Sequence, residues 1–281
     1  MLSDQGRFSE AQPLHLEALS GRRRALGDGH CDTLNSIHHV ACLLNDLGKP
    51  SEAEPLYREA LRGRLRLLGE DDNNTLGTLN NLGNVLHAQD RLAEEPLLVR
   101  ALAGLRRTLG SDHPETVGVL GNLAILMHKQ HKLAEAEPLY RETLAAMRRM
   151  LGAEHPHTLS AMNNLAAFLT SQGKVTESEP LLREVLRVRR HVLRHERPEL
   201  IGSIANLASL LKVQGKFSEA ELLCREVLQA RRRAHGNDNP ITLDAIVELE
   251  FVLRQQGNVG EADSLAREAL HSKLSGLGRR W

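Results

Sequence analysis

The chain has 281 residues, and its 36 lysine and arginine residues equal its 36 aspartate and glutamate residues, so the formal net charge is zero. Without a net positive charge there is no overall field to attract nucleic acid or an anionic membrane, and 2% aromatic residues are too few for base-stacking surfaces. The hydrophobic fraction of 41%, mainly leucine and alanine, is enough for a helical core.

The cysteines and the absence of long apolar runs indicate the compartment. Cys31, Cys42 and Cys224 include no Cys-x-x-Cys pair, which favours a reducing environment over a disulfide framework. No apolar run approaches the roughly 18 residues that a membrane span needs. The residues after Met1 do not resemble a signal peptide. We therefore predict a cytoplasmic protein without membrane insertion.

The sequence is built from a repeated unit. Its turn glycines are separated by 42 residues, except for a spacing of 41 between Gly69 and Gly110, and Arg194 stands where one glycine is missing. A fixed period of this length is typical of a solenoid, in which stacked copies bury one continuous core. The glycines are Gly27, Gly69, Gly110, Gly152, Gly236 and Gly278.

Taken in chain order, the repeats predict an all-α fold. The chain opens with a lone second helix (helix B) over 8–24, and five pairs of helices A and B follow to about residue 275. This gives about eleven helices, or about 5.5 helix-turn-helix repeats, in a single domain over 1–281. The pairs are predicted at 31–67, 73–108, 114–150, 156–193 and 240–275, with a further stretch, 198–234, between the last two.

The copy over 114–150 shows the pattern within a pair. Helix A begins at a proline, and its apolar residues fall on one face with the helical period, at Val117, Leu120, Leu123, Ala124 and Met127. A second stripe marks helix B. Three copies start helix B with what we interpret as capping boxes, at Ser51, Thr176 and Ser218.

These positions resemble the tetratricopeptide repeat (TPR). The family places large apolar residues and a small residue on helix A, and an alanine followed by an aromatic residue on helix B. Here those slots hold Leu120, Leu123-Ala124, Met127, Ala136 and Tyr140. The 42-residue length, with His-Pro-x-Thr and Asn-Leu-Ala, is similar to the repeats of kinesin light chains. The resemblance implies a right-handed superhelix with a concave groove lined by helices A.

An asparagine ladder is the main candidate site. Asn81, Asn122, Asn164 and Asn206 each precede a core leucine of helix A, and the resemblance implies that asparagines at these positions contact bound peptide. An amide can both donate to and accept from a peptide backbone. The alternative is that each amide bonds a neighbouring helix and holds the repeats together. The full set of predicted groove residues is Asn80, Asn81, His87, Asn122, His128, Asn163, Asn164, Asn206 and Lys212.

Glycines and arginines offer further candidates. Gly77, Gly118 and Gly202 lie early in helix A, and we interpret them as sites of close helix packing in preference to clearance for a ligand. Arginine clusters end each helix B and acids begin it, as the helix dipole favours. We prefer this interpretation to a locally basic edge for an acidic partner. The clusters include Arg22-Arg23-Arg24, Arg106-Arg107, Arg148-Arg149, Arg189-Arg190 and Arg231-Arg232-Arg233.

Nothing in the sequence indicates an enzyme. The chain lacks a Gly-x-Ser-x-Gly elbow and a phosphate-binding loop, and its histidines lack the spacing of a zinc site, so no catalytic residue, metal or cofactor is predicted. The leading hypothesis is an interaction scaffold or adaptor for a peptide or partner helix. The ends of the array are expected to be uncapped, which would leave Phe8, Leu16, Leu19 and the outer side of 256–275 partly uncovered and allow self-association. The alternatives are a regulatory or sensor TPR segment of a larger multidomain signalling enzyme, a nucleotide-hydrolase or protease, and a structural spacer.

Overall fold

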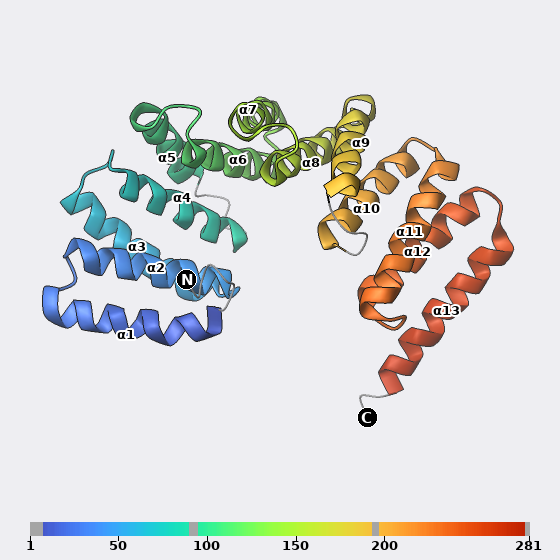
Figure 1. The fold of residues 1–281 in the computed structure, drawn as a ribbon, viewed down its shortest axis with the longest axis horizontal. Coiled ribbons are helices and arrows are strands. Elements are labelled where there is room, and N and C mark those ends of the chain that lie inside the picture. The colour runs from blue at the N-terminus through green and yellow to red at the C-terminus, as the bar shows by residue number, and fades with distance from the viewer. Residues whose placement is uncertain (1–7, 90–94, 193–196, 279–281) are drawn as a thin grey trace. The chain divides into compact units, whose positions relative to one another are not determined.

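The computed structural model describes residues 8–89, 95–192 and 197–278 (Figure 1). These residues form helices joined by short turns and contain no strand, which confirms the predicted all-α fold. The helices are α1 (Phe8–Leu26), α2 (Cys31–Asp46), α3 (Pro50–Leu67), α4 (Asn73–Ala88), α5 (Glu95–Thr108), α6 (Pro114–Lys129), α7 (Leu133–Leu151), α8 (Pro156–Ser171), α9 (Val175–Val192), α10 (Pro198–Val213), α11 (Phe217–His235), α12 (Pro240–Gln255) and α13 (Val259–Gly278).

The described residues therefore hold thirteen helices, one pair more than the predicted eleven. Helix α1 is the lone helix B. The even-numbered helices from α2 to α12 are helices A, and the odd-numbered helices from α3 to α13 are the matching helices B. The extra pair is α10 and α11, within the 198–234 stretch that the count of five pairs left out. Its apolar periodicity is intact, because Leu200, Ile204, Leu207 and Leu211 are all buried along one face of α10.

Two compact units divide the chain, residues 1–150 and 151–281, and each is described by itself. In the first unit, successive helices from α1 to α6 pack against one another, and α4 also contacts the helices A on either side, α2 and α6. In the second unit, successive helices from α8 to α13 pack in the same order, and α10 also contacts α8. A single domain over 1–281 remains a prediction.

Histidines cap several helices A. The turn before most helices A ends in a residue whose side chain accepts from the backbone N–H two residues on: Nδ1 of His113 accepts from Glu115 at 3.3 Å, and Asn239 does the same for α12. Arg197, before α10, makes no such bond. Since this N–H has no partner within the helix, the cap stabilises the helix start. His30 and His155 cap α2 and α8 in the same way.

The predicted capping boxes of helix B are wrong. Helix α3 begins at Pro50 with Lys49 as its cap, and α11 begins at Phe217 after Lys216, and neither lysine makes a side-chain capping bond. Ser51 therefore lies inside the first turn. The helices begin earlier than predicted because the chain turns at a left-handed residue and enters the helix directly after the lysine.

Residues with positive φ form the turns that follow helices B and the turns between helices A and B. The predicted turn glycines that end helices B have φ between 81° and 88° where they lie in turns, at Gly27, Gly69, Gly110, Gly152 and Gly236. Between helices A and B the same role falls to Gly48, Gly173, Gly215 and Gly257, with φ between 72° and 79°. His131 is the exception at this second slot, with φ of 59°. Gly278 is the last residue of α13, and Arg194 lies outside the described residues.

Apolar side chains were predicted to stay uncovered on the first and last helices. Leu16 of α1 is 45% exposed and Leu270 of α13 is 59% exposed, as expected. Leu19, however, is 5% exposed, because it lies on the side of α1 that packs against α2. The side chain of Phe8 lies outside the described part.

Candidate functional site

The ladder asparagines occupy one slot, the ninth residue of helix A, which we call the amide slot. It is held by Asn81 in α4, Asn122 in α6, Asn164 in α8 and Asn206 in α10. The next residue in each copy, a leucine, is buried, so the amide lies on the flank beside the core. The two units treat this slot differently.

In the first unit, the amides bond to one another. Nδ2 of Asn122 donates to Oδ1 of Asn80 at 3.1 Å, and Nδ2 of Asn80 lies 3.4 Å from Oδ1 of Asn81. Nδ2 of Asn81 in turn lies 3.4 Å from Nε2 of His38 on α2. All these side chains are partly buried. The chain of polar contacts joins α2, α4 and α6, which is the arrangement that the structural alternative describes.

A buried arginine ends this chain of contacts. Arg64 of α3 is 4% exposed and donates to Oδ1 of Asn35 at 2.7 Å and to the carbonyl of Asn74 at 2.9 Å. It also donates to Thr78, and Nη1 lies 3.3 Å from Nδ1 of His38. Burial, followed by the charge of Arg64, lowers the pKa of His38 to about 3, so this imidazole is neutral near pH 7. Sequence reasoning missed Arg64, although arginines recur at its slot: Arg22, Arg189 and Arg231.

A polar cavity of about 430 Å³ opens beside these residues in the first unit. Asn35, Arg64 and Asn81 line it, together with Gly77 and Gly118. A Cβ atom added at either glycine would meet nothing within 4 Å, and the same holds for Gly202 in the second unit. The packing role predicted for these three glycines is therefore wrong, because no neighbour approaches them; each leaves open space on helix A.

In the second unit, the amides are unengaged. Asn164 and Asn206 are exposed and make no side-chain hydrogen bond with any described residue. Asn163 is partly buried, and its Oδ1 has no partner within the described residues. Asn206 lines a cavity of about 620 Å³ between α10, α11 and α12. Its other lining residues include Ala205, Ser209, Lys212, Cys224, Val227, Arg231, Asp244, Val247 and Glu248.

Lys212, predicted as a groove residue, lines the same cavity but is already paired. Its Nζ forms an ion pair with Glu248 of α12 and lies 5.8 Å from the ring centroid of Phe251. The Lys212 side chain is 15% exposed, whereas that of Glu248 is 54% exposed. The pair therefore presents its carboxylate to solvent and covers its ammonium group.

The two histidines of the prediction have different outcomes. The side chain of His87 lies outside the described part of the structure. The ring of His128, near the end of α6, meets Tyr140 of α7 edge-on with centroids 6.2 Å apart. Burial, followed by the nearby His131, lowers the pKa of His128. His128 thus contacts the helix B of its own repeat.

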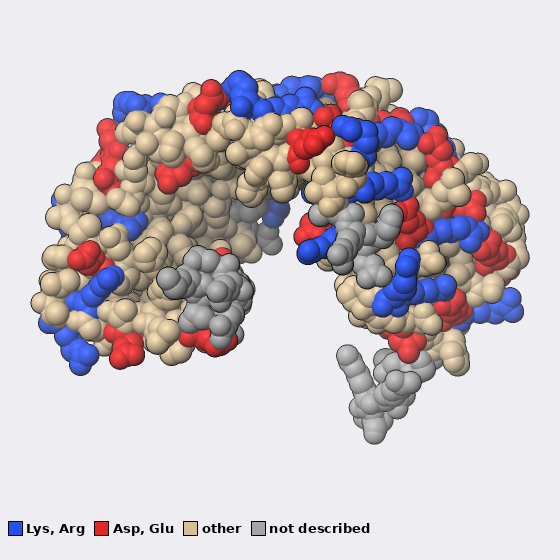
Figure 2. All heavy atoms as spheres, viewed as in Figure 1, with Lys and Arg blue, Asp and Glu red and all other residues tan. Residues whose placement is uncertain are grey.

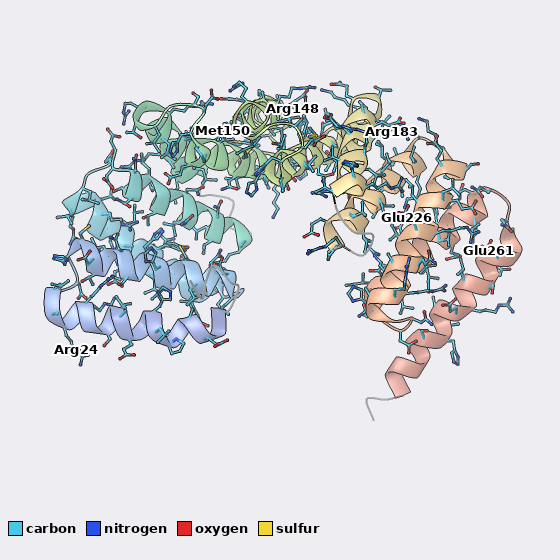
Figure 3. All side chains as sticks on the ribbon, in the orientation of Figure 1. Arg24, Arg148, Met150, Arg183, Glu226 and Glu261 are labelled. Carbon is cyan, nitrogen blue, oxygen red and sulfur yellow. The ribbon has the colours of Figure 1, made fainter. Side chains whose placement is uncertain are left out.

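The arginine clusters at the ends of helices B are largely consumed by ion pairs between repeats. Arg106 pairs with Glu142 and Arg190 with Glu226, each donor 36 residues before its acceptor. On the face drawn in Figure 2, basic and acidic side chains are interspersed. Figure 3 labels Arg183 on α9, Glu226 on α11 and Glu261 on α13. Other pairs at this spacing in the described residues include Arg23–Glu59, Arg183–Glu219, Lys212–Glu248, Arg225–Glu261 and Arg232–Glu268.

The described residues form neither a cluster of metal ligands nor a helix that could span a membrane. Within the described residues, no group of three or more His, Cys, Asp or Glu side chains converges as a metal site requires. No described helix combines the length and apolar character needed to cross a bilayer. Cys224 is buried, and the thiol of Cys42 accepts from the hydroxyl of Tyr57 at 3.2 Å.

Comparison with protein families gives a consistent result. A tetratricopeptide repeat profile matches residues 1–66, 74–149 and 119–191, a second matches 200–241, and a third matches 35–103. Together these matches cover most of the chain. No curated protein matches it at the level of sequence.

Solved structures show similar folds. Kinesin-light-chain-type, nearly identical TPR-like repeats from Podosopora anserina are 25% identical, with a TM-score of 0.64 over 73% of this chain and 98% of that one. BtubC (BKLC) from P. vanneervenii is 21% identical, with a TM-score of 0.68 over 82% of this chain and 92% of that one. A signal transduction ATPase (STAND protein) with a TPR sensor from Pyrococcus horikoshii is 11% identical, with a TM-score of 0.74 over 99% of this chain but only 41% of that one.

Proposed function

This chain belongs to the tetratricopeptide repeat family, and we propose on that basis that it is a non-enzymatic interaction scaffold or adaptor that binds a peptide or a partner helix along its helices A. The ligand contacts mainly the second unit. There the ligand runs across α8 and α10 and reaches the cavity beside α12. A cytoplasmic location, which would keep the three free cysteines reduced, is part of the same proposal.

The observation that supports this best is the state of Asn164 and Asn206. Both amides are exposed and have no hydrogen-bond partner among the described residues. Each offers two donors and one acceptor oxygen, so each can bond both the N–H and the C=O of an extended peptide. Main-chain bonding of this kind provides affinity with little dependence on sequence, and neighbouring pockets supply specificity.

The asparagines of the first unit have another role in this proposal. Asn80, Asn81 and Asn122 already bond to one another and to His38. A ligand could use them only by breaking those bonds, and a broken buried bond costs about 1–3 kcal/mol. We therefore assign these three residues to the joining of α2, α4 and α6.

The test compares two matched double variants. Peptides selected on the full wild-type chain from a displayed random library are measured by fluorescence anisotropy. Asn164→Ala with Asn206→Ala should weaken binding by about tenfold or more, which corresponds to about 1.4 kcal/mol, and leave the melting temperature unchanged. Asn80→Ala with Asn122→Ala should lower the melting temperature. Equal binding of every selected peptide to wild type and to the Asn164/Asn206 variant would contradict the proposal.

A second candidate is a regulatory or sensor segment of a larger signalling enzyme, a nucleotide-hydrolase or a protease. It is supported by the likeness to the STAND protein with a TPR sensor, which extends over 99% of this chain. The deciding observation is the genomic reading frame around this sequence. Nucleotide-binding or protease motifs in the same frame would favour the sensor, and their absence from the complete frame would favour the scaffold.

Self-association through the outermost helices remains part of the proposal. Leu14 and Leu16 of α1 are 57% and 45% exposed, and apolar side chains of this size are commonly covered in assemblies. Sedimentation of the purified chain over a range of concentrations tests this. A single monomeric species at every concentration would count against it.

A further inference from the structure

The last helix A, α12, differs from the other helices A on the side that lines the 620 Å³ cavity. Its fifth residue is Asp244, where the other copies have only asparagine, glycine or serine, and the amide slot holds Glu248. Its twelfth residue is Phe251, the only aromatic residue at that slot, and its eighth is Val247. We call Asp244, Val247, Glu248 and Phe251 the α12 patch.

These four residues share one face of the helix. They are spaced by three, four and seven residues along α12, so their side chains lie next to one another. Val247 is 45% exposed and Phe251 is 48% exposed, so both present apolar surface to solvent next to the carboxylates. Phe251 is also held in place, because its ring meets that of Phe217 edge-on with centroids 6.5 Å apart. The patch is thus an ordered surface that alternates acidic and apolar groups.

The charge that this surface presents to a ligand is negative. Asp244 is exposed and has no ion-pair partner among the described residues. Glu248 is paired with Lys212, but the carboxylate is the exposed member of that pair. The remaining cation of the cavity, Arg231, donates to the carbonyl of Ile241 at 2.9 Å. The α12 patch itself thus carries two carboxylates and no cation, and Asp244 has no ion-pair partner within the described part of the chain.

From this arrangement we propose that the α12 patch recognises a partner segment carrying a lysine or arginine beside an aliphatic or aromatic side chain. The inference rests on the proposed function and names the chemistry of the ligand at one end of its path. The cationic side chain binds Asp244 and the exposed edge of Glu248, and its aliphatic stem packs along Val247. The apolar side chain packs against Phe251. The ring already lies beside the ammonium group of Lys212, so it tolerates a nearby cation.

Exposed carboxylates contribute more to selectivity and association rate than to affinity. The patch should therefore act mainly as a filter against acidic segments, while Asn164 and Asn206 and the apolar contacts hold the backbone. Binding should weaken as salt rises, because the Debye length shortens from about 14 Å to about 6 Å between about 50 and 300 mM salt.

The test uses two pools of short fluorescent synthetic peptides with identical apolar positions. One pool carries Lys and Arg at its remaining positions, and the charge-reversed pool carries Asp and Glu. The full chain should bind the basic pool at least about tenfold more tightly than the acidic pool, as measured by anisotropy. Asp244→Asn should remove most of this preference, and Phe251→Ser, which restores the residue of α10, should weaken both pools.

A matched control is Asp238→Asn, which removes an equal charge from an exposed position in the turn before α12 and should leave the preference unchanged. Equal or tighter binding of the acidic pool, or a preference that survives Asp244→Asn, would overturn the inference. If in that case the peptides that do bind still lose binding in the Asn164/Asn206 variant, the proposed function stands and only the ligand chemistry is wrong. If neither pool binds and no displayed peptide is selected, both proposals fail.

Discussion

Nη1 of Arg189 donates to Oγ of Ser203 at 2.6 Å, and this bond joins a helix B to the helix A of the next repeat. The same nitrogen donates to the carbonyl of Glu199 at 2.8 Å. The hydroxyl lies 14 residues after the arginine. The same pairing recurs as Arg22 with Ser36 and Arg64 with Thr78. Where the arginine slot holds Leu105 or Met147, the hydroxyl slot holds Val119 or Ala161. Arg231 is the exception, because Ala245 follows it at this spacing and, within the described residues, it donates only to a backbone carbonyl, that of Ile241.

Ser203→Ala should destabilise the second unit by about 1 kcal/mol, because Arg189 loses one of its two acceptors. Urea unfolding followed by circular dichroism measures the change. Ser160→Ala is the control, since that exposed hydroxyl bonds only the carbonyl of Pro156 in its own helix. A loss no larger than in the control would mean that the inter-repeat bond contributes little.

Two glycines of unlike surroundings give a second prediction. A Cβ at Gly63 would lie 2.3 Å from a methyl carbon of Leu34, whereas a Cβ at Gly77 would meet nothing within 4 Å. Gly63→Ala should therefore cost about 1–3 kcal/mol through overpacking. Gly77→Ala should stabilise the first unit by about 0.5–1 kcal/mol, because alanine is the better helix former. Thermal unfolding of both variants checks the sign, and destabilisation by both would indicate that Gly77 has a packing role after all.

His131 provides a third prediction. It adopts φ of 59°, at the slot where Gly48, Gly173, Gly215 and Gly257 have φ between 72° and 79°. A side chain in this region costs roughly 1–2 kcal/mol, and a glycine recovers most of that, less the larger freedom it gives the unfolded chain. His131→Gly should therefore raise the free energy of unfolding by about 0.5–1 kcal/mol. The reverse change, Gly173→Ala, should lower it; no difference between the two variants would argue against strain at this turn.

The fourth prediction concerns pH. The pKa of His38 is lowered to about 3 by burial, then by Arg64 and His39, while in the unfolded chain it is about 6.5. Between these values the unfolded chain binds more protons than the folded one, so the free energy of unfolding falls as pH drops from about 6.5 toward 3. His38→Asn, which installs the residue that α4 and α8 have at this slot, should reduce that fall.

The measurement for His38 is urea unfolding of wild type and variant at several pH values in that window. The carboxylates that titrate in the same window are common to both proteins, so the difference between them isolates His38. His157→Asn, at an exposed position, is the control and should follow the wild-type curve. Parallel curves for wild type and His38→Asn would contradict the prediction.

The helix positions could be predicted because every copy repeats the same apolar period, as Leu120, Leu123 and Met127 illustrate. The amide slot could also be found from the repeats. Which of these side chains is already hydrogen-bonded or ion-paired could not be predicted, because that depends on residues of neighbouring helices and not on the slot itself. Asn122 donates to Asn80, the eighth residue of the preceding helix A, whereas Asn206 makes no side-chain hydrogen bond with any described residue although Asn163 holds that position before it. Lys212 was taken as free for a ligand, although Glu248, 36 residues later, pairs with it.

The 36-residue ion pairs bear on how such a chain can change in length. The copy over 198–234 supplies one donor for the copy after it, Arg232 to Glu268, and one acceptor for the copy before it, Glu226 from Arg190. Duplicating or removing such a copy as a whole leaves a donor facing an acceptor between the repeats on either side. At the junction before the copy shortened by one residue, Leu65 holds the donor position and Arg100 the acceptor position, so this ion pair is not formed. Adding whole repeats therefore keeps these ion pairs, whereas inserting part of a repeat would leave a charged side chain without its partner at each junction.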